Sequence, residues 1–288
     1  MTAKAGVVGW PIEHSLSPVL HRYWLKEYNI DGSFDCIPAE PGKFKDLVSS
    51  LRAGDFRGVN VTVPFKEEAH RIADFHDTAA KITGAVNLLV FHENGLTEGK
   101  NTDAFGLSAS LAESLGEDAL VGKIAVIFGT GGAARAAALA VNDPLKAKPI
   151  YVLGRKAIRA ERLVAHLTRW TSGKRKTDYR AGILDDWRSI AGQASLLINA
   201  TTAGMGTNPA LDINLNAMRR EAAVCDLVYH PLLTPLLKDA ASLGHRIIDG
   251  LGMLMHQAVP SFEAFFGIRP KVTPGLREAL VKTLADRG

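Results

Sequence analysis

The chain has 288 residues, which is longer than one typical domain and predicts two. Apolar residues make up 47% of it and charged residues 22%, which is typical of a globular protein with a full core. The net charge of +4 is mild, and the dense basic run Lys174-Arg175-Lys176 has no interleaved aromatic side chains for base stacking. We therefore expect this run to be a solvated loop, and we expect no nucleic acid partner.

Cysteine spacing and hydropathy indicate the compartment. Cys36 and Cys225 lie far apart with no C-x-x-C spacing, which argues against a disulfide framework or a zinc site and favours a reducing environment. No apolar run approaches the roughly 20 residues that span a bilayer. The run Ala5-Gly6-Val7-Val8-Gly9 is too short for a signal peptide and is typical of a strand. These features predict a cytoplasmic protein with no membrane partner.

The first hundred residues alternate short apolar runs with helical stretches. Strands are predicted over residues 6–9, 33–38 and 56–63. Helices are predicted over residues 18–28, 44–52 and 64–73. A hairpin over residues 85–101 would turn at Glu93-Asn94-Gly95. The alternation predicts a small α/β domain with a mostly parallel sheet.

The middle of the chain repeats strand and helix more regularly. Five strands with continuous apolar runs are predicted, over residues 124–128, 150–153, 196–199, 224–228 and 246–249. Such runs fit a parallel sheet that is covered on both faces. Two final helices, over residues 253–266 and 274–285, have no strand partner. They could pack back on the first domain, which would make that domain discontinuous.

A glycine loop follows the first of these five strands and reads Gly129-Thr130-Gly131-Gly132-Ala133-Ala134. Between a strand and an alanine-rich helix, G-x-G-x-x-G/A indicates a dinucleotide whose pyrophosphate rests on the helix N-terminus. An ordinary glycine turn is the alternative interpretation.

The next strand ends in a basic segment, Gly154-Arg155-Lys156-Ala157-Ile158-Arg159. An NAD site usually has Asp or Glu about 20 residues past the glycine loop, to bind the ribose 2′-hydroxyl. Three cations without a carboxylate would instead neutralise a 2′-phosphate, so the segment favours NADP. The alternative is a solvated loop before a basic helix start, which the helix dipole opposes.

Polar side chains in the first hundred residues could form a reaction centre. Ser15 and Ser17 could offer two hydroxyls to a carboxylate, although an N-cap serine followed by a helix-starting proline also explains them. Lys66 ends the segment Asn60-Val61-Thr62-Val63-Pro64-Phe65-Lys66, whose plain interpretation is a strand followed by a helix-starting proline. A cation in a first helical turn is opposed by the dipole, and a lysine so placed can exchange a proton.

Asn87 and Asp103 complete the candidate set. For Asp103 the plain alternative is an N-cap or first-turn acid of a helix over residues 104–115. If Lys66 and Asp103 meet in space, they form the ion pair needed to pass a proton to an alcohol oxygen while hydride leaves its carbon. The nine histidines show no metal-binding spacing, and the chain has no G-x-S-x-G or G-x-x-x-x-G-K-[ST] motif, so we expect neither a metal nor those chemistries.

These motifs resemble those of the shikimate dehydrogenases over nearly the whole chain. Gly9-x-Pro11-x-x-His14-Ser15-x-Ser17-Pro18 resembles the opening motif, whose two serines hold the substrate carboxylate. The segment from Asn60 to Lys66 is similar to the signature in which Thr62 would bind substrate and Lys66 would be catalytic. The motifs that contain Asn87 and Asp103 resemble those that supply an asparagine to ring hydroxyls and the aspartate partner of that lysine, which also contacts substrate.

The resemblance continues beyond the glycine loop. Asn199-Ala200-Thr201-Thr202-x-Gly204-Met205 is similar to a cofactor-side loop. Asp226-Leu227-Val228-Tyr229 and Gly250-Leu251-Gly252-Met253-Leu254-x-x-Gln257-Ala258 resemble segments from which Tyr229 and Gln257 would reach the substrate. The cofactor would be bound by Gly129, Thr130, Gly131, Gly132, Ala133, Gly154, Arg155, Lys156, Arg159, Leu227 and Gly250.

Four positions depart from the family pattern. The usual Asn-Arg-Thr after the second cofactor strand is here Gly154-Arg155-Lys156, which keeps the arginine and loses the asparagine and threonine contacts. Ala104 replaces a common glycine and Phe265 a common tryptophan, and we expect both to be packing changes.

The resemblance implies an α/β fold with two domains and a cleft between them. Residues 1–103 and 255–288 would form the substrate-binding and catalytic domain, and residues 104–254 a Rossmann-like, doubly wound NADP-binding domain. The implied activity is the reversible NADPH-dependent reduction of 3-dehydroshikimate to shikimate, on the route to aromatic amino acids, by a monomer or homodimer. The alternatives are an NAD-dependent quinate/shikimate dehydrogenase, an aminoshikimate specialist and a non-catalytic NADP-binding sensor.

Overall fold

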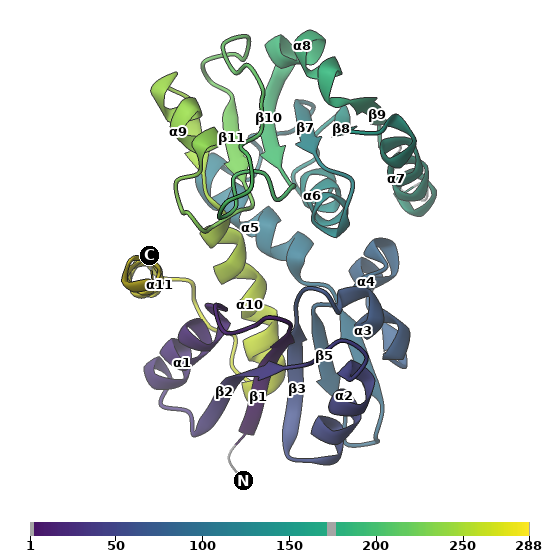
Figure 1. Cartoon of the computed structure of the whole chain (residues 1–288), viewed down its shortest axis with the longest axis vertical. Helices are drawn as coiled ribbons and strands as arrows, with labels where there is room; N and C mark the ends of the chain where they lie inside the picture. Colours follow the sequence, from purple (N-terminus) through teal and green to yellow (C-terminus); the bar gives the residue numbers. More distant parts are fainter. Residues whose placement is uncertain (1–2, 172–176, 288) are drawn as a thin grey trace. The chain divides into compact units, whose positions relative to one another are not determined.

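The structure, a computed structural model, describes residues 3–171 and 177–287. The basic run Lys174-Arg175-Lys176 lies outside the described residues. The chain divides into two compact units, a first unit of Met1–Thr102 with Gln257–Gly288 and a second unit of Asp103–His256. Both units combine strands and helices (Figure 1), which confirms the predicted α/β class.

The first unit is built on a six-stranded sheet in the order β2-β1-β3-β5-β6-β4. Its strands are β1 (Ala3–Gly9), β2 (Gly32–Pro38), β3 (Phe56–Val61), β4 (Phe75–His76), β5 (Leu88–Phe91) and β6 (Thr97–Lys100). Only β5 runs antiparallel to its neighbours, and it forms the predicted hairpin with β6. The sheet is therefore mostly parallel, as the sequence predicts.

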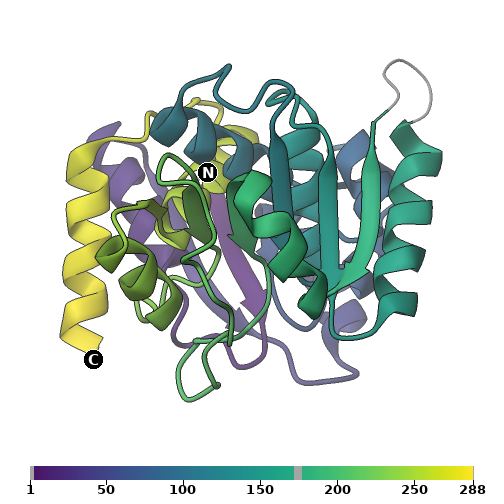
Figure 2. The ribbon, with the colours of Figure 1, turned by 90° about the horizontal axis from the view of Figure 1, so that it is seen from above.

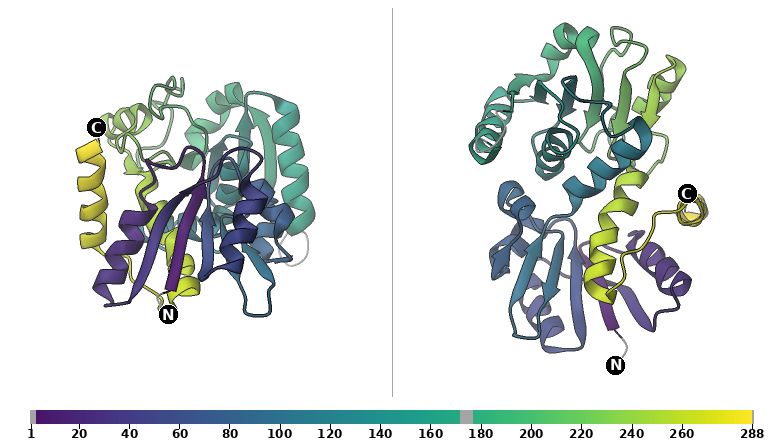
Figure 3. Two further views of the ribbon diagram at one scale, coloured as in Figure 1. Left: turned by 60° about the horizontal axis from the view of Figure 1, so that its bottom comes forward. Right: turned by 180° about the vertical axis from the view of Figure 1, so that it is seen from behind.

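Helices cover both faces of this sheet. Neighbouring residues of a strand point to opposite sides, so that both faces carry apolar side chains. Val8 of β1 packs in one core cluster with Phe44, whereas Val7 packs in another with Phe34 and Phe265. The first cluster belongs to α2 (Phe44–Ala53) and α3 (Lys66–Ile72), and the second to α10 (Gly250–Phe266), which lies against the sheet from Gln257 onward (Figure 3). The unit also contains α1 (Ser17–Glu27), α4 (Thr78–Thr83) and α11 (Pro274–Arg287).

The second unit is built on a fully parallel six-stranded sheet in the order β12-β11-β10-β7-β8-β9. Its strands are β7 (Ile124–Phe128), β8 (Ile150–Gly154), β9 (Tyr179–Ile183), β10 (Ala194–Asn199), β11 (Ala223–Asp226) and β12 (Arg246–Ile248). This is the strand order of doubly wound dinucleotide-binding folds. The chain adds strands toward one side of the sheet from β7 to β9 and toward the other side from β10 to β12, so the strand order reverses between β7 and β10. The predicted Rossmann-like fold is confirmed.

The helices of the second unit are α5 (Asp103–Leu115), α6 (Gly132–Asn142), α7 (Ala157–Thr171), α8 (Trp187–Ile190) and α9 (Pro235–Ser242), with the first turns of α10 and short 3₁₀ turns at Leu184–Asp186 and Ala191–Gln193. On one face, Phe128 and Trp187 meet edge to face in the core, and the Trp187 indole donates to the Asn214 carbonyl over 2.9 Å. Helix α7 packs beside the edge strand β9 (Figure 2).

Several predicted element boundaries are off by two or three residues: β1 begins at Ala3 and not at residue 6, β3 ends at Val61 and not at residue 63, and α10 begins at Gly250 and not at residue 253. At two helix starts the local structure also differs from the predicted one. Pro64 does not begin a helix: the Phe65 N–H donates to the Thr62 carbonyl over 2.9 Å in a tight turn, and α3 begins only at Lys66. The N-cap of α1 is Leu16, with helical dihedrals, and not the serine that one interpretation of the sequence expects. No side chain caps this helix. The strands β4 and β9 and the helices α4 and α8 are not predicted from the sequence, because they are short or lie at a half-exposed sheet edge.

Candidate active site

Polar side chains of the first unit gather at one edge of its sheet. The parallel strands β1 and β3 end there, since Val8 pairs with Val61. The antiparallel strand β5 begins there beside the end of β6, since Leu88 pairs with Lys100. The loops and helix starts at this edge carry the predicted residues Ser15, Ser17, Thr62, Lys66 and Asn87.

Backbone hydrogen bonds hold Thr62 and Lys66 at this edge. The Thr62 N–H donates to the Val8 carbonyl over 2.9 Å, and the Thr62 methyl packs so closely on Gly9 that a Cβ there would lie 2.6 Å from it. The Lys66 carbonyl, at the first residue of α3, accepts from the Val86 N–H over 2.9 Å. The lysine backbone is thus tied to the segment that carries Asn87.

Asn87 is the buried centre of a small hydrogen-bond network. Its amide nitrogen donates to the Gln257 side chain of α10 and to the Thr102 hydroxyl, each over 3.0 Å. Its amide oxygen accepts from the Thr102 N–H over 2.8 Å. The structure therefore brings Asn87 and Gln257 together, and their contact with a substrate remains a prediction.

Two supporting asparagines are not among the residues predicted from the sequence. Asn101 donates to the Thr83 hydroxyl over 3.1 Å and to the Ala85 carbonyl over 3.0 Å. Asn60 donates to the Asn87 carbonyl over 3.1 Å and to the Ser261 hydroxyl over 2.7 Å. Both stand inside motifs that do point to function, but only the fold shows that their amides hold neighbouring loops.

Ser15 lies in the loop that leads into α1, and Ser17 is the first residue of that helix. The Ser15 hydroxyl accepts from the Ser17 N–H over 3.2 Å, which fixes the turn before the helix. Neither serine caps α1, so the alternative explanation by an N-cap serine is wrong. Their hydroxyls remain candidates for a substrate carboxylate.

Asp103 is the first residue of α5 and only 6% exposed. It is a first-turn acid, as the plain alternative states, and the positive end of the helix dipole stabilises its carboxylate. Asp103 belongs to the second unit and Lys66 to the first, and their pairing stays a prediction.

The glycine loop lies where β7 ends, at the reversal point of the second sheet. The Gly129 N–H donates to the Leu153 carbonyl over 2.9 Å, and α6 begins at Gly132 without a side-chain cap. A Cβ built at Gly131 or Gly132 would meet no atom within 4 Å. The helix start therefore leaves space for a pyrophosphate against its backbone N–H groups, so the residues present fit a dinucleotide.

Gly129 is the one position of this loop where only glycine fits. Its φ is +125°, and a Cβ would lie 2.8 Å from the Ala200 carbonyl oxygen. We expect Gly129→Ala to lower the free energy of unfolding of the second unit by about 1–3 kcal/mol and to weaken nicotinamide dinucleotide binding. Thermal unfolding checks this, with Gly131→Ala as the control that should unfold like the parent. Equal stability of G129A and the parent would contradict the close approach.

A buried carboxylate organises the loops after β10 and β11. Asp226 accepts from the Asn199 amide over 3.0 Å, from the Val228 N–H over 3.1 Å and from the Thr234 hydroxyl over 2.7 Å. Burial raises the pKa of Asp226, and these three hydrogen bonds lower it in part. Asn199 in turn accepts from the Thr201 N–H over 3.1 Å. The network fixes the loop that presents Tyr229, although Asp226 itself is not among the predicted residues.

The remaining predicted cofactor residues lie at the same edge of the second sheet. Leu227 and Gly250 meet directly, since a Cβ at Gly250 would overlap the Leu227 carbonyl. Arg155 and Lys156 are exposed between β8 and α7. Arg159, in the first turn of α7, lines a pocket together with Thr130 of the glycine loop.

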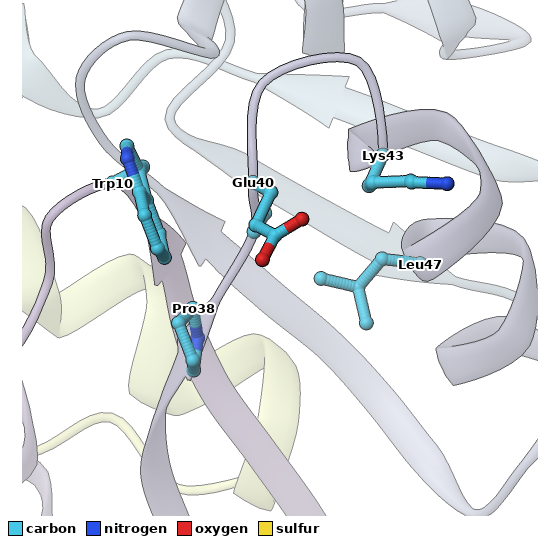
Figure 4. Close-up of a pocket in the computed structure, with 6 residues that line it drawn as sticks. Trp10, Pro38, Glu40, Lys43 and Leu47 are labelled. Carbon is cyan, nitrogen blue, oxygen red and sulfur yellow. The ribbon is translucent and has the colours of Figure 1, made fainter.

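A second hollow, of about 280 Å³, lies in the first unit (Figure 4). It is lined by Trp10, Pro38, Ala39, Glu40, Lys43 and Leu47. None of the predicted site residues lines it, so we assign it no part in the reaction.

Within the described residues, no group of three or more His, Cys, Asp or Glu side chains could hold a metal ion. No helix among them is both long and apolar enough to cross a bilayer.

A doubly wound sheet with a glycine loop at its reversal point, in one chain with a second α/β unit, is typical of nicotinamide-dinucleotide dehydrogenases. Residues 7–89 match the family described as "Shikimate dehydrogenase substrate binding domain". The chain is 43% identical to the shikimate dehydrogenase (NADP(+)) of Methylobacterium radiotolerans, over 99% of this chain and 98% of that protein. The chain belongs to the shikimate dehydrogenase family.

Solved structures agree with this assignment. The shikimate 5-dehydrogenase of Thermus thermophilus in complex with NADP(H) and shikimate has a TM-score of 0.84 and 32% identity, over 98% of this chain and 99% of that one. A quinate dehydrogenase of Corynebacterium glutamicum in complex with NAD has a TM-score of 0.86 and 27% identity, with the same coverage of 98% and 99%. Similarity of fold thus extends to both cofactor types, and the distinction between them depends on individual side chains.

Proposed function

We propose that the chain catalyses the reversible NADPH-dependent reduction of 3-dehydroshikimate to shikimate. The observation that carries this proposal is the placement of Lys66 at the start of α3, on the sheet edge where Thr62 and the Asn87–Gln257 pair also lie. The match of residues 7–89 to the substrate-binding domain and the full-length relationship to NADP-dependent enzymes support the same activity.

When bound, the cofactor supplies the hydride that reduces the substrate carbonyl carbon. Lys66 donates a proton to the carbonyl oxygen as the negative charge develops there, so that a ketone becomes a secondary alcohol. Asp103 is the proposed partner of Lys66 in this proton transfer. In the oxidation direction the neutral amine of Lys66 accepts the proton of the alcohol, and the same carboxylate stabilises the cation that forms.

The other residues hold the reactants. Ser15 and Ser17 bind the carboxylate of the substrate, and Thr62, Asn87, Asp103, Tyr229 and Gln257 bind its hydroxyl groups. On the cofactor, the N–H groups of the glycine loop bind the pyrophosphate and the cations after β8 bind the adenosine side. Such a set orients the reacting carbon and limits the freedom lost at the transition state.

The division of labour follows from these roles. We assign residues 1–103 and 255–288 to substrate binding and catalysis and residues 104–254 to NADP binding. The two compact units, whose boundaries fall after Thr102 and after His256, support this division.

We also propose that the enzyme acts in the cytoplasm without a nucleic acid partner, as a monomer or homodimer. The two free cysteines fit a reducing compartment, and light scattering of the purified chain reports the oligomeric state.

The test is turnover of the purified chain with shikimate or quinate, each with NADP or NAD. We expect formation of reduced nicotinamide to be fastest with shikimate and NADP, with kcat/KM for NADP at least about tenfold above that for NAD, because a charge-assisted hydrogen bond to the 2′-phosphate adds about 1.5 kcal/mol or more. A preference for quinate with NAD would identify the sister activity. Dinucleotide binding without any turnover would identify a sensor and refute the enzymatic proposal.

A further inference from the structure

The second unit contains a pocket of about 260 Å³ whose lining is strongly cationic. Its walls are Thr130, Arg135, Arg159, Arg162, Leu163 and His166. Three guanidinium groups, one imidazole and one hydroxyl thus converge, and no lining residue is acidic. Of these six residues, only Thr130 and Arg159 are among the cofactor residues predicted from the sequence.

Two helices and the glycine loop build this pocket. Arg159, Arg162, Leu163 and His166 follow one another at the three- and four-residue spacing that places side chains on one face of α7. Leu163 is only 4% exposed and packs this face into the core, whereas Arg159 and Arg162 are exposed and His166 is half-buried. Arg135 comes from the first turn of α6, and Thr130 from the loop before it.

The pocket lies next to the end of β8. Thr130 packs on Gly154, where a Cβ would lie 2.7 Å from the threonine methyl. In doubly wound folds the residues just past this second strand contact the ribose of the adenosine, and a phosphate on its 2′ position is met by arginine. A phosphate placed here would meet side chains from both α6 and α7.

The charges give this arrangement a physical purpose. Cations gathered on one small surface repel one another, and a dianion bound among them offsets this repulsion because it attracts each of them. Guanidinium groups also match two phosphate oxygens at once, and the Thr130 hydroxyl can donate a further hydrogen bond. By contrast, Arg155 and Lys156 do not line the pocket.

We propose that Arg162 and His166 of α7, together with Arg135 of α6, bind the 2′-phosphate of NADP beside Arg159. This inference rests on the proposed function and names its cofactor-specificity residues. Discrimination between NADP and NAD is then carried mainly by the face of α7 and not by the loop Gly154-Arg155-Lys156. That loop can depart from the usual Asn-Arg-Thr pattern because other cations hold the phosphate.

Binding of two adenosine nucleotides tests this directly, without turnover. We expect the parent to bind adenosine 2′,5′-bisphosphate at least about tenfold more tightly than adenosine 5′-monophosphate by calorimetry, because the second phosphate adds ionic hydrogen bonds. Arg162→Gln and His166→Asn should each weaken bisphosphate binding, by about tenfold for R162Q, and leave monophosphate binding within about twofold. Arg188→Gln removes an exposed cation of α8 outside the pocket and should change neither affinity.

The outcomes separate this inference from the proposed activity. If the double variant R162Q/H166N binds the bisphosphate as tightly as the parent, while its thermal unfolding is normal, the pocket does not hold the 2′-phosphate and the inference is overturned. A loss for both nucleotides alike would also overturn it, because the residues would then act on the fold or on the adenine. If instead the nucleotide series behaves as expected but shikimate is not oxidised with either dinucleotide, the activity is refuted and the phosphate site stands.

Discussion

Replacing Lys66 with methionine is expected to lower kcat for shikimate oxidation by about 10²–10⁴-fold, which is the usual contribution of a positioned proton donor or acceptor. Methionine is similar to lysine in length and flexibility, but it has no ammonium group and no proton to transfer. The backbone carbonyl of this residue accepts from the Val86 N–H over 2.9 Å, and the substitution leaves this contact unchanged. KM for shikimate should therefore change only a few fold, since substrate binding is assigned to other residues.

Steady-state kinetics with both substrates saturating measures this effect. Lys81→Met, the same change at an exposed position of the neighbouring helix α4, is the matched control and should retain normal kcat. A near-normal kcat for K66M would remove the lysine from the mechanism, and a rise in KM alone would reduce it to a binding residue.

The partnership of Lys66 and Asp103 is testable in the same assay. If the two side chains act as one proton-transfer unit, Asp103→Asn should also lower kcat strongly, and the double variant should be about as slow as the slower single variant. Independent roles would instead multiply the two losses. This comparison decides whether the carboxylate acts through the lysine or only binds substrate.

Much of the fold follows from the sequence, because parallel strands that are buried on both faces read as continuous apolar runs. Ile124–Phe128 and Ala194–Asn199 are such strands, and both were predicted within two residues. The edge strand Tyr179–Ile183 contains Arg180 and Gly182 and is largely exposed, so it gives no comparable signal. Local hydrogen bonding also overrides a local rule at Pro64, where a turn precedes the helix.

The candidate site divides in the same way. Lys66 and Gly129 stand out in the sequence, because a first-turn cation and a glycine turn between strand and helix are locally unusual. Arg162 and His166 do not, since their meaning depends on the register of α7 and on Arg135, which comes from a different helix. Counting forward from Arg159 by three and by seven residues is the signal that could find them.

Acidification is expected to destabilise the first unit through His21. This residue has no exposed surface, and its imidazole stacks on Phe34 with ring centroids 3.8 Å apart and meets the edge of Trp24 at 6.0 Å. Neither ring nitrogen has a hydrogen-bond partner among the described residues. Burial lowers the pKa of His21 from 6.5 to about 3, because a charged imidazole would have to leave water for an aromatic cluster.

The direction of the effect follows from proton binding. Below a pH of about 6.5 the imidazole of the unfolded chain is protonated, whereas in the folded chain it stays neutral down to about 3. The unfolded state therefore binds more protons over this range, and stability falls as the pH falls. Each pH unit costs about 1.4 kcal/mol, so the contribution of His21 near pH 4.5 is a loss of roughly 2.5 kcal/mol relative to pH 7.

His21→Leu, which is similar in volume and cannot titrate, isolates this contribution. Its own stability near pH 7 is not the readout, because repacking shifts it by an unrelated amount. The readout is the change between the two pH values, and we expect the parent to lose roughly 2.5 kcal/mol more than the variant. Urea unfolding followed by hydrogen exchange of β1 and α1 peptides observes the first unit separately from the second. His14→Leu, at an exposed position, should follow the parent. If the stabilities of H21L and the parent fall equally between the two pH values, the imidazole takes up its proton equally in the folded and unfolded states, and the prediction is contradicted.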